Sequence, residues 1–248
     1  MKLTEHKVLV TGGSTGIGLA IAKAFSELDC HVAICGREPV KLEKAKSIVR
    51  NVETIQCDLE RPEAIAHLLT DVNNRLGGLS LLINNAAIQK NYVFPGRDLQ
   101  LSISDVNQEV QINLLSLINL SVASLPLLTN NPSAAIVNMT SGLAITPKAN
   151  AAIYCATKSA VHSFSCALRY QLQDAVPHIK LFEAMLPLVD TDMTKGRGKG
   201  KISPAEVVKA ILKGMAEDKY DIAVGKVRAL RLIHRLAPSL AASILRNG

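Results

Sequence analysis

The stretch that decides the fold of this chain is Thr11-Gly12-Gly13-Ser14-Thr15-Gly16-Ile17-Gly18. It follows a short apolar run, Val8-Leu9-Val10, and leads into a helix-forming segment at residues 19–25. A strand, a Gly-rich turn and a helix in this order let backbone N–H groups and the positive end of the helix meet a phosphate. The glycines allow tight turning, close approach of the phosphate, and close packing of helix on strand. We therefore predict a dinucleotide-binding turn here.

Short apolar segments alternate with longer amphipathic segments through the rest of the chain. We predict seven strands, at Lys7–Thr11, His31–Gly36, Val52–Cys57, Leu79–Asn84, Ala134–Thr140, Ile179–Met185 and Asp221–Val224. We predict six helices, near residues 16–29, 39–50, 61–76, 102–129, 152–174 and 203–217. Strands separated by helices are typical of a parallel sheet covered on both faces. The expected fold is α/β, a single-domain, three-layer, doubly wound Rossmann fold over residues 1–248 with a seven-stranded parallel sheet.

The composition limits the partners of the chain. Its 248 residues are 48% hydrophobic and 3% aromatic, with no Trp and a net charge of +7. The scarcity of aromatic side chains argues against nucleic acid as a partner, and the positive charge fits either an ordinary basic protein or one that prefers anionic ligands. The five cysteines form no Cys-x-x-Cys pair, so we expect a reducing, cytoplasmic location and no metal site. No apolar run reaches the length of a membrane span.

The end of the second predicted strand indicates which dinucleotide binds. In dinucleotide folds, an acidic residue roughly 20 positions beyond the turn binds the ribose hydroxyls of NAD, whereas an Arg accommodates the 2′-phosphate of NADP. Here the strand ends in Gly36-Arg37-Glu38, and Arg37 lies nineteen positions past Gly18. Because an Arg can meet a phosphate bidentately, we predict that NADP(H) is preferred, with NAD(H) as the alternative cofactor. In the other interpretation Arg37 is only an exposed charge, with Glu38 interfering.

Several other predicted strands end in residues suited to a cofactor edge. They are Asp58 and Leu59 after the third strand, Asn85, Ala86 and Ala87 after the fourth, and Pro187, Val189 and Thr191 after the sixth. The Asp58 carboxylate could bond an adenine amino group, and small residues after Asn84 let the backbone approach a ligand. An Asn at a strand end is often only a turn former. The coincidence of these segments at one edge of the sheet favours a cofactor site.

The candidate catalytic pair is Tyr154 and Lys158, which share one face of a predicted helix at i and i+4. A free Tyr titrates near 10, too high for acid–base work at neutral pH. A neighbouring ammonium favours the phenolate and lowers that pKa. Ser141 ends the fifth strand and could bond a substrate carbonyl, while Asn113 lies in mid-helix, where it could distort the helix and hold water. A Tyr and a Lys at this spacing also occur as a solvated pair on helix faces.

Together these motifs resemble the short-chain dehydrogenase/reductase family, in its compact branch of about 250 residues. The resemblance runs from Thr11 to about Thr191. It implies that the phosphate turn is formed by Gly12, Ser14, Thr15, Gly16, Ile17 and Gly18, and that the adenine contact is Asp58. The resemblance also implies cofactor contacts at Asn85, Ala86, Tyr154, Lys158, Pro187 and Thr191. From their places at strand ends, we expect further contacts at Arg37, Leu59, Ala87 and Val189. The catalytic tetrad that the resemblance implies is Asn113, Ser141, Tyr154 and Lys158.

The resemblance implies an oxidoreductase that moves a hydride between NADP(H) and a carbonyl or secondary alcohol, as a homodimer or homotetramer. Two residues depart from the family pattern: Ala87 and Leu188 each replace a usual Gly. Two runs, at residues 83–89 and 187–193, look most like the DltE-like bacterial reductases. That likeness names no substrate.

Two segments interrupt the alternation of strands and helices. Residues 190–202 alternate Gly with basic side chains, which predicts either a solvated loop or a mobile lid over the substrate. Lys195, Lys199 and Lys201 in this loop hint at an anionic substrate, although a solvated loop explains them as well. The basic tail at 227–248 predicts a terminal helix, interrupted at Pro238, packed on the core or on a partner subunit. A membrane-surface helix is the less favoured alternative.

Two rival functions deserve comparison. Gly12-Gly13-Ser14-Thr15-Gly16 also fits the Gly-x-Ser-x-Gly elbow of hydrolases. We reject that interpretation because the elbow would lie on the first strand, with no earlier strand to supply an oxyanion hole. A non-catalytic dinucleotide sensor or scaffold on the same fold remains the alternative function, since fold alone does not fix activity.

Overall fold

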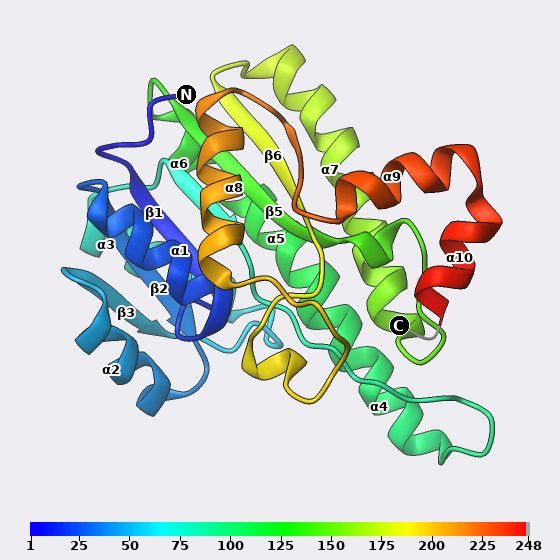
Figure 1. Cartoon of the computed structure of the whole chain (residues 1–248). Coiled ribbons are helices and arrows are strands. Elements are labelled where there is room, and N and C mark those ends of the chain that lie inside the picture. The colour runs from blue at the N-terminus through cyan, green and yellow to red at the C-terminus, as the bar shows by residue number, and fades with distance from the viewer. Residues whose placement is uncertain (247–248) are drawn as a thin grey trace.

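A seven-stranded parallel sheet forms the centre of the molecule in the computed structural model, which describes residues 1–246 (Figure 1). Its strand order is β3-β2-β1-β4-β5-β6-β7. The strands are β1 Lys7–Thr11, β2 His31–Gly36, β3 Val52–Gln56, β4 Leu81–Asn84, β5 Ala134–Ser141, β6 Ile179–Leu186 and β7 Asp221–Ala223. All strands run parallel, but the chain adds β2 and β3 on one side of β1 and β4 to β7 on the other. Doubly wound folds bind ligands at this switch point, between β1 and β4. The predicted Rossmann fold and its seven strands are confirmed.

Helices cover both faces of this sheet and bury its strands on both sides. On one face lie α1 Gly16–Glu27, α2 Pro39–Ile48 and α8 Pro204–Ala216; on the other lie α3 Ala64–Leu76, α5 Ser116–Ala123, α6 Leu125–Thr129 and α7 Ala152–Ala175. Side chains of a strand alternate between faces: Val8 and Val10 pack with Phe25 of α1, whereas Leu9 packs in the cluster that contains Leu68 of α3. This double burial explains why the strands read as continuous apolar runs.

The single helix predicted over residues 102–129 is wrong in its detail. The structure has α4 Leu99–Val110, a π-helix at Gln111–Leu115 (η1), and then α5 and α6. Asp98 begins α4 by accepting a hydrogen bond from the backbone N–H of Leu101 at 2.9 Å. Pro126 falls in the first turn of α6, where a proline is tolerated, and it separates α6 from α5. The sequence showed the apolar periodicity but not these changes of helix type.

The tail forms two short helices, α9 Val227–Leu236 and α10 Pro238–Arg246, which fold against each other beside α7 (Figure 1). Val227 and Ala241 are buried, and the backbone N–H of Ala149 donates to the carbonyl of Arg246 at 3.0 Å. This hydrogen bond ties α10 to the loop that leads into α7. Leu232, Leu236, Leu240 and Ile244 remain exposed. The break predicted at Pro238 is confirmed, since that residue begins α10.

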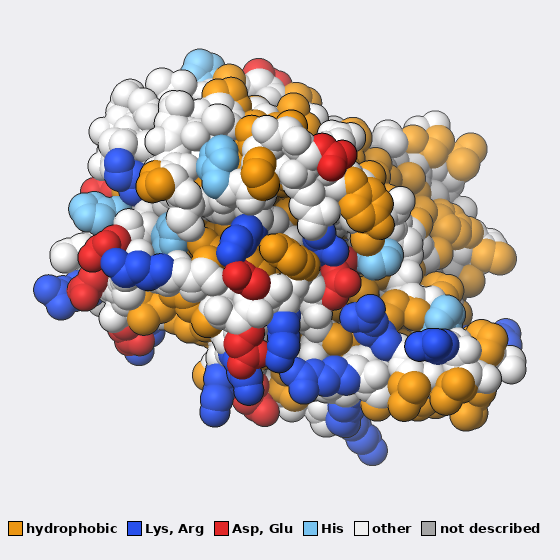
Figure 2. All heavy atoms as spheres, turned by 90° about the horizontal axis from the view of Figure 1, so that it is seen from above, with side chains coloured by type: hydrophobic (Ala, Val, Ile, Leu, Met, Phe, Trp, Pro, Cys, Tyr) orange, Lys and Arg blue, Asp and Glu red, His pale blue; other side chains and the backbone are white. Residues whose placement is uncertain are grey.

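The surface carries its charges in a mixed pattern. On the face seen in Figure 2, Lys and Arg side chains are interspersed with acidic and hydrophobic ones. Among residues 1–246, no helix is both long and apolar enough to cross a membrane.

Candidate active site

One cleft runs along the carboxyl edge of the sheet, across the point where the strand order reverses. Most of the residues predicted for cofactor binding line it: Gly12, Ser14, Thr15, Gly16, Ile17, Arg37, Asp58, Leu59, Asn85, Ala86, Ala87, Tyr154, Lys158 and Thr191. The other predicted residues do not line the cleft itself: Gly18, Asn113, Ser141, Pro187 and Val189. Gly18, Asn113 and Val189 are buried and act through packing and hydrogen bonds.

The Gly-rich turn between β1 and α1 has no room for larger side chains. A Cβ at Gly18 would lie 2.3 Å from the carbonyl oxygen of Gly12, and a Cβ at Gly13 would lie 2.6 Å from the Ile34 side chain. Gly12 and Gly16 have φ angles of +62° and +54°, a region that favours glycine. Thr15 provides no side-chain cap to α1, and the first turn holds no acidic residue. The backbone N–H groups that begin α1 are therefore suited to an anion, as a pyrophosphate site requires.

The buried Thr11 hydroxyl holds the ends of β1 and β4 together. Its oxygen accepts hydrogen bonds from the backbone N–H groups of Asn85 and Ala86, each at 3.0 Å. The Asn85 amide donates in return to the carbonyl of Thr11 at 2.9 Å. These bonds fix the segment predicted to lie under the cofactor. The sequence analysis quoted Thr11 as part of the turn but assigned it no role.

The far end of the cleft is positively charged. Arg37 is exposed there, and Lys41 of α2 lines the cleft beside it. Glu38, the residue expected to interfere, is instead paired with Lys41 at 2.7 Å. Within residues 1–246, the guanidinium of Arg37 takes part in no ion pair. The Asp58 carboxylate accepts from the backbone N–H of Glu60 at 3.1 Å, which orients it at the end of β3.

Asn113 lies at the centre of the π-helix η1, fully buried. Its side chain accepts from the N–H of Ile88 and donates to the carbonyl of Ile88, both at 2.8 Å, and it also donates to the Thr157 hydroxyl at 3.3 Å. The predicted helix distortion at Asn113 is thus present, because a π-turn widens the helix. The side chain bridges the segment after β4 and helix α7.

Tyr154 and Lys158 project from the first turns of α7 into the cleft, as their spacing predicts. The Lys158 Nζ atom lies 5.7 Å from the centroid of the Tyr154 ring and donates to the carbonyl of Met139 at 2.8 Å. Lys158 is only 3% exposed. Ser141 ends β5, and its hydroxyl accepts from the backbone N–H of Leu143 at 3.1 Å.

The ionisation of this pair differs from the sequence expectation. Burial raises the pKa of Tyr154 to about 12, an effect only partly opposed by the Ser141 hydroxyl and the Arg197 guanidinium. Burial also lowers the pKa of Lys158 to about 8, against the pull of the Glu183 carboxylate. The expected lowering of the Tyr154 pKa by Lys158 is therefore absent, because the ammonium is directed toward Met139. At pH 7 the Tyr154 hydroxyl is therefore neutral.

Comparison with known proteins accords with this geometry. The family model for short chain dehydrogenase matches residues 6–201. The uncharacterized oxidoreductase DltE of Bacillus subtilis is 40% identical over 237 residues, 93% of this chain and 92% of that protein. An uncharacterized oxidoreductase of Staphylococcus epidermidis is 27% identical, over 88% of this chain and 94% of its own length.

The chain belongs to the short-chain dehydrogenase family. Two solved structures show the same fold, each with a TM-score of 0.87. One is a family member from Burkholderia phymatum in complex with NAD, 18% identical, covering 100% of this chain and 97% of that one. The other is from Burkholderia cenocepacia in complex with NADP, 20% identical, covering 100% of both chains. The family match ends at residue 201, so helices α8 to α10 lie beyond it.

The loop at 190–202 is closed at its base in this short-chain dehydrogenase. The N–H of Asp190 donates to the carbonyl of Ile202 at 2.9 Å, and Lys201 pairs with Asp190 at 3.1 Å. Leu188, which departs from the family pattern, fills the space beside Gly198, where a Cβ would lie 2.5 Å from its Cδ2 atom. Only residues 192–194 are helical, as one 3₁₀ turn. The rest of the segment forms no helix.

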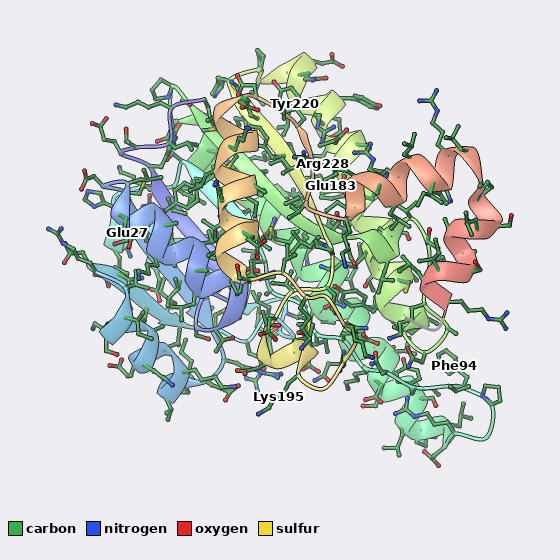
Figure 3. The ribbon with its side chains drawn as sticks, in the orientation of Figure 1. Glu27, Phe94, Glu183, Lys195, Tyr220 and Arg228 are labelled. Carbon is green, nitrogen blue, oxygen red and sulfur yellow. The ribbon has the colours of Figure 1, made fainter. Side chains whose placement is uncertain are left out.

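Arg197 is the basic residue of this loop that the sequence analysis did not single out. Lys195 lies on the outer side of the loop (Figure 3) and Lys199 is exposed, whereas Arg197 is partly buried. Its Nη2 donates to the carbonyl of Gln89 at 3.4 Å, and its buried Nη1 has no hydrogen-bond partner among the described residues. Two other groups near the site were also missed: the buried Glu109, and the pair of His162 with Glu183. They come together only in the folded chain, and no sequence spacing indicates them.

Proposed function

We propose that this protein is an NADP(H)-dependent reductase or dehydrogenase that acts on a carbonyl or secondary alcohol with Tyr154 as general acid–base. One observation carries the proposal: a single cleft connects Arg37 and Lys41 at one end with Tyr154 and Lys158 at the other. A dinucleotide fits such a cleft, because the uncapped start of α1 and the Gly12–Gly18 turn lie between these ends. When bound, the cofactor supplies or accepts the hydride.

The residues of the chain hold the reactants and move the proton. Ser141 donates its hydroxyl hydrogen to the substrate oxygen, and Tyr154 donates its phenolic proton to the same oxygen as negative charge develops there. The Lys158 ammonium stabilises the phenolate that this transfer leaves behind. The widened turn around Asn113 supports the water that returns the proton to Tyr154. This sequence requires a neutral Tyr154, which is the form that its raised pKa favours at pH 7.

We propose that Arg37 and Lys41 together bind the 2′-phosphate of NADP. An Arg presents two parallel donors to a phosphate, and Lys adds a point charge. Because Glu38 is paired with Lys41, it does not oppose the phosphate as strongly as a free carboxylate would. NAD(H), which lacks that phosphate, would bind more weakly.

Fluorescence titration of NADPH and NADH, in wild type and in Arg37→Ala, tests the cofactor assignment. We expect NADPH to bind at least about tenfold more tightly than NADH in wild type, with this difference largely lost in the variant. Lys44→Ala removes a positive charge from the exposed side of the same helix α2 and serves as the matched control. Failure of both nucleotides to bind would overturn the proposal. Binding without turnover on a broad carbonyl panel would favour the sensor or scaffold alternative.

On the substrate side, we propose that residues 190–202 act as a lid whose Arg197 faces the reacting group. The support is that the Arg197 charge acts on Tyr154 and that its Nη1 atom is buried with no hydrogen-bond partner within residues 1–246. A substrate with a carboxylate or phosphate near its carbonyl would satisfy that nitrogen. Arg197→Gln should then raise KM for such substrates more than for neutral ketones, whereas Lys199→Gln should change neither.

We also propose that the chain forms a homodimer or homotetramer through the helices near 102–129 and 152–174. Leu115, Val122 and Tyr170 on these helices are exposed large side chains. Light scattering coupled to size-exclusion chromatography measures the mass directly. A single 26.6 kDa species at all concentrations would contradict this assembly.

A further inference from the structure

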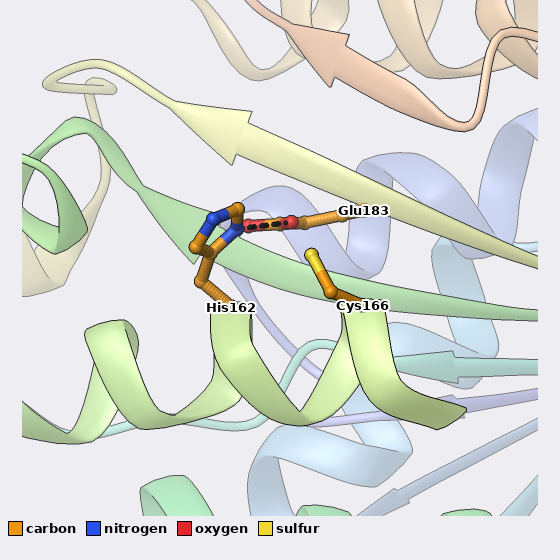
Figure 4. Close-up of side chains that lie close together, drawn as sticks. All are labelled: His162, Cys166 and Glu183. Atoms are coloured by element: carbon orange, nitrogen blue, oxygen red, sulfur yellow. Dashed lines mark hydrogen bonds and ion pairs between the residues drawn. The ribbon is translucent and has the colours of Figure 1, made fainter. Parts of the chain in front are cut away.

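A cluster of three potential metal ligands lies outside the cleft, between helix α7 and strand β6. His162 and Cys166 sit one turn apart on α7, and both point toward Glu183 of β6 (Figure 4). The ligand atoms of the three side chains all lie within 4.8 Å of one another. His162 Nδ1 and a Glu183 carboxylate oxygen are already 2.7 Å apart. No role in the proposed reaction uses His162 or Cys166.

The chemistry of these donors is that of a zinc site. An imidazole nitrogen, a thiolate and a carboxylate oxygen are the three donor types that Zn²⁺ accepts, at bond lengths of about 2.0–2.3 Å. Donors around a tetrahedral ion of that size are about 3.3–3.8 Å apart. The His162–Glu183 pair would open slightly and the Cys166 side chain would close slightly to reach that spacing.

The surroundings hold the carboxylate in place for a cation. Glu183 is 2% exposed, and the Thr140 hydroxyl donates to its other oxygen at 2.5 Å. A hydrogen bond of this kind orients a metal-binding carboxylate. The His162 side chain is 45% exposed and Cys166 is partly exposed, so an ion can enter from solvent. A small hollow beside the cluster is lined by His162, Glu183, Asp221 and Arg231, which leaves this side of the His162–Glu183 pair open.

Charges of both signs surround the cluster. Glu183 and Asp221 are negative, and Cys166 becomes negative when it binds, while Arg169, Arg231 and Lys158 are the neighbouring cations. Arg169 is neutralised by Asp221, to which it donates at 2.9 Å. Binding breaks the S–H bond of Cys166 and forms a Zn–S bond, with the proton released to solvent.

We propose that His162, Cys166 and Glu183 form a Zn²⁺-binding site separate from the dinucleotide cleft. We expected no metal site from the sequence, which has no Cys-x-x-Cys pair; here two donors lie on α7 and the third lies on the next strand, β6. The inference does not rest on the proposed enzymatic function. It assigns to this face of the molecule a ligand that the nicotinamide chemistry does not need.

Calorimetric titration of the full-length, EDTA-treated protein with ZnCl₂, without nucleotide or substrate, tests the site. We expect one ion per chain, and we expect His162→Ala and Cys166→Ala each to weaken binding at least about tenfold. Both residues are partly exposed, so these variants should fold, which circular dichroism checks. His178→Ala and Cys30→Ala are matched controls from outside the cluster and should leave affinity unchanged.

Cobalt substitution gives a second, independent measurement. Co²⁺ bound by a thiolate shows a near-ultraviolet charge-transfer band, which should be present in wild type and in Cys30→Ala but absent in Cys166→Ala. Absence of zinc binding by wild type would overturn the proposal. So would zinc affinity that is unchanged in both His162→Ala and Cys166→Ala, because the ion would then bind elsewhere.

Discussion

Lys158 directs its ammonium to the carbonyl of Met139, 2.8 Å away, rather than to the hydroxyl of Tyr154. Its Nζ atom lies 5.7 Å from the Tyr154 ring centroid. The two side chains share a helix face, yet Lys158 is held by the end of β5. The buried Glu183 carboxylate raises the pKa of Lys158, against the effect of burial.

Replacing the tyrosine tests the proton donor. Tyr154→Phe should lower kcat for carbonyl reduction by about 10²–10⁴-fold, the usual range for a general acid. NADPH affinity should stay within about twofold, because the ring and its packing remain. Tyr170→Phe removes a hydroxyl from an exposed position on the same helix and is the matched control. A kcat that survives Tyr154→Phe, measured by NADPH absorbance, would remove Tyr154 from the mechanism.

Neutralising Glu183 should move the pH profile. The carboxylate raises the pKa of Lys158, which burial lowers to about 8. Without that charge, as in Glu183→Gln, the Lys158 pKa falls further and the ammonium is lost at lower pH. The alkaline limb of kcat should then shift toward lower pH. Glu206→Gln, at the exposed start of α8, is the control and should leave the profile unchanged. An unmoved or alkaline-shifted limb in Glu183→Gln would contradict this coupling.

Removing the buried charge of Lys158 should stabilise the fold while abolishing activity. Its pKa is about 8 in the folded chain and 10.5 in its ordinary state, so the unfolded state binds more protons between these values. This group therefore adds stability as pH rises from about 8 to about 10.5, and it destabilises the fold at pH 7. We expect Lys158→Met to raise Tm at pH 7 by about 2–6 °C.

The increase in Tm of Lys158→Met over wild type should become smaller as pH approaches 10.5, because the wild-type lysine is then neutral in the folded chain. Calorimetric melting curves at both pH values measure it, with Lys209→Met on the exposed side of α8 as the control. A lower Tm at pH 7 would mean that the bond to Met139 and the attraction of Glu183 outweigh the cost of burial.

The Thr11 hydroxyl should matter for both stability and cofactor binding. Thr11→Val keeps the shape but leaves the N–H groups of Asn85 and Ala86 without their shared acceptor. An unsatisfied buried donor costs about 1–3 kcal/mol. Chemical denaturation should therefore show a free energy of unfolding that is lower by about that amount. NADPH affinity should fall with it, because these N–H groups fix the segment under the cofactor. Thr70→Val, on the exposed side of α3, is the control. Unchanged stability and affinity would show that other bonds hold this segment.

Much of the architecture follows from local sequence. The apolar runs that became β1, β2 and β5 are buried on both faces and bounded by Gly, Asn or Ser, so their positions were predicted within one or two residues. The helix over 102–129 was less accurate, because the π-turn at Asn113 depends on tertiary contacts to Ile88 and Thr157, and the break at Pro126 was not recognised. The same apolar periodicity fits one long helix or several short ones.

The site was predictable only where a motif repeats a known spacing. The Gly-rich turn and the Tyr154–Lys158 pair have such a spacing, and the structure brings both to one cleft. Arg197 and the His162–Glu183 pair have none, since each depends on a loop or strand packing against a distant helix. The sequence predicted a lowered pKa for Tyr154, whereas burial raises it. Neither the burial of Tyr154 nor the orientation of Lys158 can be inferred from the spacing of the two residues.

The hydrogen bond from Ala149 to Arg246 makes the end of the chain part of the entrance to α7. Any molecule that pulls on α10, or an expression tag fused behind it, would act directly on the loop three to eight positions before Tyr154. Experiments that attach affinity tags or surface linkers at this end therefore risk perturbing the catalytic helix. For measurements of turnover, a label at an exposed position of α8, such as Lys209, avoids both this hydrogen bond and the cleft.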